Sequence, residues 1–377
     1  MPLLTLYFPM NPNPMLWLAC AAMIACEQPP DTLLTSNPLV TDLDQTVDAH
    51  ARPYMQDPDH VGLSIGIWTD SQAYYYGYGE TAQGNGQLPD LHTIFEIGSI
   101  SKTFSAALLT DALAAHGMSP ETPISQLLPP DIPKLQHGGQ EILVKHLLNH
   151  SSGLPRIPDD LTRGWNRDNP YAHYDSTKVY AFLRTYTLTR TPGTEHAYSN
   201  LASGLAGLIL ERLTGKSFEQ NLTERITQPL GLLHTSITVP AGSDFAKGYI
   251  RKGRETPYWD LAGLKAAGGI RSTTSDMLQY GRYQLGGAPS PLDTLFARCQ
   301  VPTFTQTGEP AFEVGLGWFL ISLNGHTCLY HDGGTGGFSS HLFICPATQQ
   351  VVTLLMNGTD EDAVATLGFG LAAEVIE

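Results

Sequence analysis

Charged residues are scarce in this chain of 377 residues, and basic residues are scarcer than acidic ones. Only 15% of the residues are charged, and 21 Lys and Arg stand against 36 Asp and Glu, which gives a formal net charge of −15. An acidic surface repels phosphate backbones, so the composition argues against nucleic acid as a partner. No apolar run approaches the roughly 20 residues that a membrane-spanning helix needs, which excludes a polytopic membrane protein.

Several motifs of metal, nucleotide and hydrolase sites are also missing. No C-x-x-C occurs, which excludes zinc ribbons and thioredoxin-like redox chemistry, and no G-x-G-x-x-G follows a strand. The G-x-S-x-G elbow of α/β-hydrolases is absent. His146 and His150 have the spacing of metal ligands but lack the Glu of H-E-x-x-H between them, so we interpret both as structural, with metal ligation as the weaker alternative. We therefore expect no cofactor.

An apolar segment near the N-terminus is typical of an export leader. Residues 15–25 read MLWLACAAMIA, which is the length of a signal-peptide core, and the polar sequence EQPPD follows Cys26. Ala25 before Cys26 resembles the lipobox of bacterial lipoproteins, in which that Cys is lipidated after cleavage, although no Lys or Arg precedes Met15. We expect residues 1–26 to be a signal or lipoprotein leader and the mature protein to be exported, either periplasmic or attached to a membrane through Cys26.

Loss of this leader would leave three cysteines, Cys299, Cys328 and Cys345. An odd number leaves at least one thiol unpaired. Cys328 and Cys345 flank a Gly-rich turn and could face each other across a hairpin, so a disulfide between them is one of the open pairings.

Hydrophobic patterns place strands at both ends of the chain and helices between them. Two β-branched or aromatic runs, 63–68 and 73–78, predict a strand pair, and a helical spacing from 100 to 116 predicts a helix that stops at Gly117. The other predicted elements are helices at about 40–52, 203–213 and 361–375, and late strands at 316–321, 327–330, 341–344 and 351–356. We predict an α+β fold in which both ends build one sheet and a mostly helical lobe, about 120–260, is inserted, with a cleft between the two.

The only S-x-x-K in the chain stands where a long predicted helix begins, with Ser99 and Lys102 as its ends. Ser99 would lie in the first turn, close to free backbone N–H groups and the positive end of the helix dipole. Lys102, three residues on, lies on the same face, where a cation eases removal of the hydroxyl proton. The alternative is a Ser cap followed by a solvated Lys.

The only Y-x-N contains Tyr198 and Asn200 and precedes the predicted helix at 203–213. A phenol is a poor base unless nearby cations lower its pKa from about 10, and Lys102 is a group that could do so. Asn200 offers a donor and an acceptor that could orient a substrate amide or the Lys. The alternative is a surface Tyr in a loop.

A Gly-rich segment, His331-Asp332-Gly333-Gly334, ends an apolar strand. In a strand His331 and Gly333 face one way and Asp332 the other, which argues against a Ser99–His331–Asp332 triad. The Gly334 amide, with that of Ser99, could point at a developing oxyanion. The alternative is a tight turn that needs glycine.

In this order, the three motifs resemble those of the serine β-lactamase and penicillin-binding-protein superfamily, in particular its class C-like branch of β-lactamase-related esterases and peptidases. The similarity covers about residues 55–375, and its supporting stretches are FEIGSISKTF (95–104), VKHLLNHSSGLP (144–155), PGTEHAYSN (192–200), AAGGIRSTTSDM (266–277), GLGW (315–318) and HDGGTGGF (331–338). It implies a β-lactamase/transpeptidase-like fold, with an antiparallel sheet flanked by helices. It also implies a catalytic domain at 55–377, preceded by a linker and first helix at 27–54.

The resemblance further implies a role for each residue. Ser99 would be the nucleophile that accepts the acyl group, and Lys102 with Tyr198 would move its proton. Substrate and oxyanion would be held by the remaining residues, Asn200, His331, Gly333 and Gly334. Many relatives have Lys-Thr-Gly where this chain has His-Asp-Gly, and because His titrates near 6.5 the fixed cation that anchors a substrate carboxylate is weakened.

From this we predict a serine hydrolase that forms an acyl-enzyme with a small ester, amide or peptide substrate. β-Lactam hydrolysis and D-alanyl-D-alanine carboxypeptidase activity are the alternatives on the same site, and a catalytically silent cell-envelope binding protein is the alternative of another class. Specificity is expected in the loops around 155–175 and 280–312. The sequence does not determine the oligomeric state.

Overall fold

The computed structural model describes residues 33–286, 290–308 and 311–376. The predicted leader, with Cys26, lies outside the described residues, as do residues 27–32 of the predicted linker. Among the helices described, none is both long and apolar enough to cross a membrane. The boundary predicted between 27–54 and 55–377 stays a prediction.

The described residues build an eight-stranded antiparallel sheet from both ends of the chain. A strand from the first quarter of the chain pairs with the last strand, in the register Leu63↔Met356 to Trp68↔Val351. The order across the sheet is β2 (Gln72–Gly79), β1 (Gly62–Thr69), β14 (Gln350–Met356), β13 (Ser339–Cys345), β12 (His326–Gly334), β11 (Phe319–Leu323), β10 (Phe312–Val314) and β9 (Phe304–Gln306). This confirms the predicted α+β fold and the prediction that strands from both ends share one sheet.

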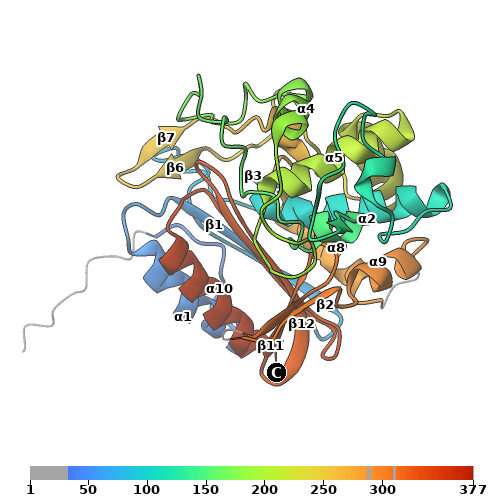
Figure 1. Ribbon diagram of the computed structural model, residues 1–377. Helices are drawn as coiled ribbons and strands as arrows, with labels where there is room; N and C mark the ends of the chain where they lie inside the picture. Colours follow the sequence, from blue (N-terminus) through green and yellow to red (C-terminus); the bar gives the residue numbers. More distant parts are fainter. Residues whose placement is uncertain (1–32, 287–289, 309–310, 377) are drawn as a thin grey trace, which may run out of the picture. The chain divides into compact units, whose positions relative to one another are not determined.

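Two helices from opposite ends of the chain cover one face of the sheet, α1 (Asp42–Met55) and α10 (Glu361–Val375). Figure 1 shows them side by side, α1 in blue and α10 in red. Thr41 caps the start of α1: its hydroxyl accepts from the Asp44 backbone, and the Asp44 carboxylate accepts from the Thr41 backbone. Buried Val47 and Leu371 belong to the apolar cluster on this face.

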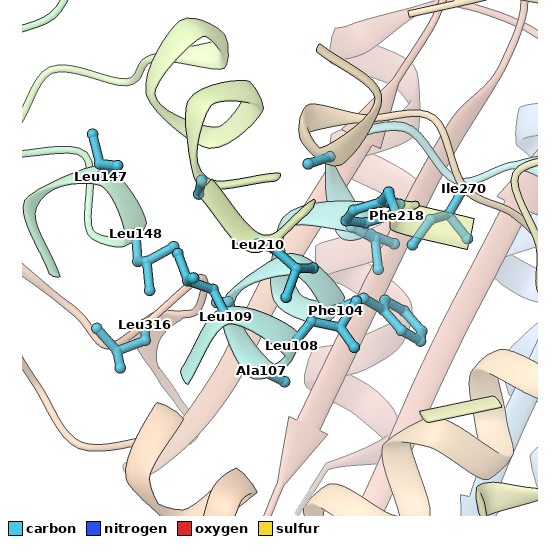
Figure 2. Packing of buried hydrophobic residues seen from close by; sticks show 14 of the residues in the cluster. Phe104, Ala107, Leu108, Leu109, Leu147, Leu148, Leu210, Phe218, Ile270 and Leu316 are labelled. Atoms are coloured by element: carbon cyan, nitrogen blue, oxygen red, sulfur yellow. The ribbon is translucent and has the colours of Figure 1, made fainter. Parts of the chain in front are cut away.

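The other face carries a larger core around α2 (Ser101–Ala115), with α5 (Asn200–Thr214) and α8 (Thr274–Gln284) packed nearby. Nearly every residue of α2 up to Leu113 is buried, which suits a helix that is apolar on all sides. Figure 2 shows Phe104 and Leu108 of α2 among apolar side chains from several other elements. Because α2 lies at the centre of this core, its first turn is packed against both the sheet and the helical region.

A long stretch of chain leaves the sheet region at β3 (Ile94–Glu96) and returns at β8 (Arg271–Thr273). These two strands pair, and a buried ion pair joins Glu96 to Arg271 across them at 3.0 Å. Between them lie α2, α3 (Val144–Leu148), α4 (Ser176–Thr185), α5, α6 (Phe218–Leu222), α7 (Gln228–Leu230) and the hairpins β4 (Gln136–His137) with β5 (Gln140–Glu141) and β6 (Gly248–Ile250) with β7 (Arg254–Thr256). A further helix, α9 (Asp293–Cys299), follows α8.

Two strand predictions differ from the structure in their extent. The strand predicted at 316–321 begins only at Phe319, because Gly317 has φ +80° and makes a turn ahead of it. The strand predicted at 327–330 continues to Gly334, so the His-Asp-Gly-Gly segment is extended backbone paired with β13 rather than a turn. The thiols of Cys299, Cys328 and Cys345 are all buried and free.

Candidate active site

Ser99 lies in a single 3-10 turn, η1 (Gly98–Ile100), that joins β3 to α2. The turn starts at Gly98, which has φ +48°, and a Cβ built there would lie 2.5 Å from the backbone nitrogen of Gly334. Only glycine tolerates both that backbone conformation and that approach. The sequence prediction put Ser99 in the first turn of the long helix, and the structure puts it in the turn just before, next to β12.

Lys102 is buried, and its amine contacts the Ser99 hydroxyl. Its Nζ lies 2.8 Å from Ser99 Oγ and donates a hydrogen bond of 2.6 Å to the carbonyl of Ala267, which belongs to the 3-10 turn η4 (Ala262–Ala267). Burial holds the pKa of Lys102 well below its usual value of 10.5; the Asp332 carboxylate opposes this shift, and Arg156 adds to it. This shift favours the neutral amine, which has a lone pair for the hydroxyl proton.

Tyr198 stands beside this pair. Its ring centroid is 4.8 Å from Lys102 Nζ, and a hydrogen bond links its hydroxyl to the side chain of Ser99. Burial raises the pKa of Tyr198 above its usual value of 10.0, against the smaller lowering by that hydrogen bond. Lys102 was considered as a group that could lower the pKa of the phenol, but the pKa is raised, because burial disfavours the charged forms of both side chains.

The residues around Tyr198 fix its position. The next residue, Ser199, is buried and caps α5: its hydroxyl accepts from the backbone of Ala202 and donates to the carbonyl of Pro155. Asn200 is the first residue of α5, and its Oδ1 is buried without a hydrogen-bond partner among the described residues. A buried acceptor left open at this place can receive an N–H or O–H from a substrate.

His331 faces the same site from β12. It is 1% exposed, its Nδ1 lies 2.6 Å from the carbonyl of Asp332, and its ring is 6.4 Å from that of Tyr198. Burial lowers the pKa of His331 to about 4, so the imidazole is neutral at pH 7 and does not titrate near 6.5 as the sequence suggested. Since its Nδ1 bonds to a backbone carbonyl and not to the Asp332 carboxylate, no triad forms.

The first of the two glycines after Asp332 lets β12 approach the Ser99 turn. A Cβ on Gly333 would lie 2.1 Å from the carbonyl oxygen of Ile97, whereas one on Gly334 would meet no atom within 4 Å. The Ser340 hydroxyl donates to the same Ile97 carbonyl at 2.9 Å and ties this turn to β13. The structure thus brings the three predicted motifs together at one place: Ser99, Lys102, Tyr198, Asn200, His331, Gly333 and Gly334.

His150 was interpreted as structural and lies directly behind Tyr198. Its ring packs on that of Tyr198 at 4.2 Å, and its Nδ1 accepts from the backbone of Ser199 at 3.2 Å. It has φ +60°, an uncommon conformation for a non-glycine residue and a frequent one at functional sites. Burial holds the pKa of His150 well below 6.5. The only hint of this contact in the sequence is that His150 belongs to the stretch 144–155 that carries part of the family resemblance.

The other histidine of that pair, His146, is structural. Its Nδ1 accepts from the backbone of Leu143 at 3.1 Å, at the start of α3. Within the described ranges, no group of three or more His, Cys, Asp and Glu side chains is arranged to hold a metal ion.

Comparisons with known proteins identify the family of this chain. The family model described as Beta-lactamase matches residues 47–376. A β-lactamase of Pseudomonas fluorescens is 29% identical over 357 residues, covering 84% of this chain and 94% of that protein. The D-alanyl-D-alanine-carboxypeptidase/endopeptidase AmpH of Escherichia coli (strain K12) is 26% identical over 312 residues, covering 80% of each.

Solved structures share the fold. The crystal structure of a β-lactamase/D-alanine carboxypeptidase from Pseudomonas syringae matches with a TM-score of 0.76 at 24% identity, covering 88% of this chain and 98% of that one. A class C β-lactamase structure matches with the same TM-score of 0.76. With a family model that spans almost all of the described residues, this chain belongs to the β-lactamase family of serine hydrolases.

Proposed function

We propose that the protein hydrolyses a carboxylic ester or amide through an acyl-enzyme on Ser99. The observation that carries this proposal is the buried Lys102 amine, whose Nζ lies 2.8 Å from Ser99 Oγ. A hydroxyl is a weak nucleophile until a base within hydrogen-bond reach takes its proton, and this contact supplies that base.

Lys102 is the base in this scheme and Tyr198 a neutral proton carrier. In the structure Lys102 Nζ donates to both Ser99 Oγ and the Ala267 carbonyl. A neutral amine has two N–H groups and one lone pair, so it can keep its bond to Ala267 and turn the lone pair toward Ser99 to accept the hydroxyl proton. Burial favours the uncharged form of both Lys102 and Tyr198. A phenol that keeps its proton can pass it to a leaving group and recover it from Lys102.

Acylation and deacylation then use the same groups. Ser99 Oγ bonds to the acyl carbon, its proton passes to Lys102, and the oxyanion rests on the backbone amides of Ser99 and Gly334. The bond to the leaving group breaks as that group receives the proton through Tyr198. Water next attacks the acyl carbon and gives a proton to the same pair, and the Ser99 hydroxyl is restored as the acid leaves. Asn200 Oδ1, buried and unpartnered, would orient the substrate.

The second candidate is β-lactam hydrolysis or D-alanyl peptide cleavage on the same site. It is favoured by the relatives, among them a β-lactamase and a D-alanyl-D-alanine-carboxypeptidase/endopeptidase. It is weakened by the neutral His331 in the third motif, because a neutral imidazole supplies no fixed charge for a substrate carboxylate. A silent binding protein is disfavoured, since a receptor has no chemical need for a desolvated Lys beside a Ser.

Replacing Ser99 by Ala should lower hydrolysis of a short-chain para-nitrophenyl ester on the order of 10³-fold or more, because the nucleophile is gone. Lys102→Ala should cost on the order of 10²-fold or more through loss of the base. Steady-state rates of protein lacking residues 1–26 provide the measurement. The matched control is Ser125→Ala, whose hydroxyl instead donates to Glu141. A near-normal rate in Ser99→Ala would contradict the assignment of Ser99 as the nucleophile.

The pH profile of ester hydrolysis should report the protonation of Lys102. Protonation removes the base, so kcat/KM should fall as the pH is lowered, with a midpoint below the ordinary lysine value of 10.5. His331→Asn should leave that midpoint in place, because the pKa of His331 is about 4. A rate that develops only as the pH approaches 10.5, or a midpoint that moves with His331→Asn, would contradict this role for Lys102.

His331→Lys should raise the ratio of penicillin to ester turnover about ten-fold, because it restores a cation for the substrate carboxylate. Both substrates are measured on the same preparation, and His331→Gln, which stays neutral, is the matched control. An unchanged ratio in His331→Lys would show that the missing charge in the third motif is not what limits β-lactam turnover.

We also propose that residues 1–26 direct export, with Cys26 as the lipidation site of a membrane-attached form. In bacteria that produce the full chain, the protein should fractionate with membranes and incorporate labelled fatty acid, and Cys26→Ser should abolish the label. Unlabelled protein in the periplasm would support export but contradict lipidation at Cys26. Unprocessed protein in the cytoplasm would contradict both export and lipidation.

A further inference from the structure

Arg156 is held at the edge of the site by its backbone. Its carbonyl accepts hydrogen bonds from the backbone of Asn200 at 2.8 Å and of Leu201 at 3.2 Å, so it is tied to the first turn of α5. Its side chain is exposed, in contrast to the buried side chains of Lys102 and His331.

The guanidinium of Arg156 and the amine of Lys102 both lie near the ring of Tyr198. Arg156 Cζ lies 5.1 Å from the ring centroid, and Lys102 Nζ lies 4.8 Å from the same centroid. A cation over an aromatic face is held there with modest energy. The positive charge of Arg156 reaches the reacting groups, because it contributes to the lowered pKa of Lys102.

Arg156 has no carboxylate partner among the described residues, whereas three other arginines near the inserted region do. Arg271 pairs with Glu96, Arg225 with Asp111 and Arg254 with Asp168. A guanidinium is always charged and presents donors in a fork that matches a carboxylate. Since burial favours the neutral forms of Lys102 and His331, Arg156 is the permanent positive charge next to Tyr198.

One negative charge acts on the site from the third motif. Asp332 is exposed and is the largest influence that favours the charged form of Lys102. Asp332 follows His331 along β12 and lies opposite His341 of β13. Successive strand residues point to opposite faces, so the Asp332 side chain points away from the face that carries His331. A bound anion would therefore be favoured on the Arg156 side of Tyr198 and repelled from the third motif.

We propose that Arg156 binds a carboxylate of the substrate, so that the preferred substrates are esters or amides that carry a negative charge near the scissile bond. This inference rests on the proposed acyl-enzyme function and names its substrate class. It places recognition of that charge on the loop between α3 and α4, where the Arg156 carbonyl is bonded to the first turn of α5, and not on the third motif.

Two matched pairs of esters test the proposal on protein without residues 1–26. The first pair is mono-para-nitrophenyl glutarate and its methyl ester, which differ in charge on the acyl side. The second is the acetyl ester of para-hydroxybenzoate and that of its methyl ester, which differ on the leaving-group side. The readout is the ratio of kcat/KM for the charged and neutral members, because any effect of Arg156 on Lys102 changes both members alike.

Arg156→Gln should lower the charged-to-neutral ratio about ten-fold in at least one pair. Salt should lower the wild-type ratio, since an exposed charge is screened, and should have little effect in the variant. Arg298→Gln, which removes an exposed charge on α9, is the matched control and should keep the wild-type ratio. Equal ratios in wild type and Arg156→Gln for both pairs would overturn the proposal. Absence of any Ser99-dependent hydrolysis would instead contradict the proposed function.

Discussion

The proposed chemistry of this protein depends on one contact, between the buried Lys102 amine and the Ser99 hydroxyl. A charged ammonium in this position would lack a carboxylate within ion-pair distance among the described residues, and removing it from water is costly. The uncharged amine avoids this cost and is the form that accepts a proton. In the proposed mechanism, burial of Lys102 is thus what makes its amine available as the base.

The rest of the fold holds that contact in place. Helix α2 is buried through most of its length, so its first turn cannot shift without disturbing the core. The Ala267 carbonyl fixes the amine from one side, and Gly98 and Gly333 allow the sheet to touch the Ser99 turn. His150 and Ser199 hold Tyr198 beside it. The sheet, the core helix and the inserted region each contribute one part of the site.

The sequence predicted the parts of this arrangement that depend on local pattern. Apolar spacing marked α2 and α5, and S-x-x-K and Y-x-N marked Ser99 and Tyr198, because helix periodicity and short motifs are carried within a few residues. It did not predict the neutral state of His331, which results from packing by distant segments, or the contacts of His150 and Arg156 with Tyr198. Those contacts join residues more than 40 positions apart, although Arg156 does fall in a loop expected to set specificity.

Trapping the covalent intermediate tests the account most directly. Protein quenched with acid during turnover of para-nitrophenyl acetate, then digested and mapped by mass spectrometry, should carry an acetyl group on the peptide that contains Ser99. That adduct should form much more slowly in Lys102→Ala. Product formation with no adduct at Ser99, or with the acetyl group on Lys102 or Tyr198 instead, would contradict the assignment of Ser99 as nucleophile and Lys102 as its base.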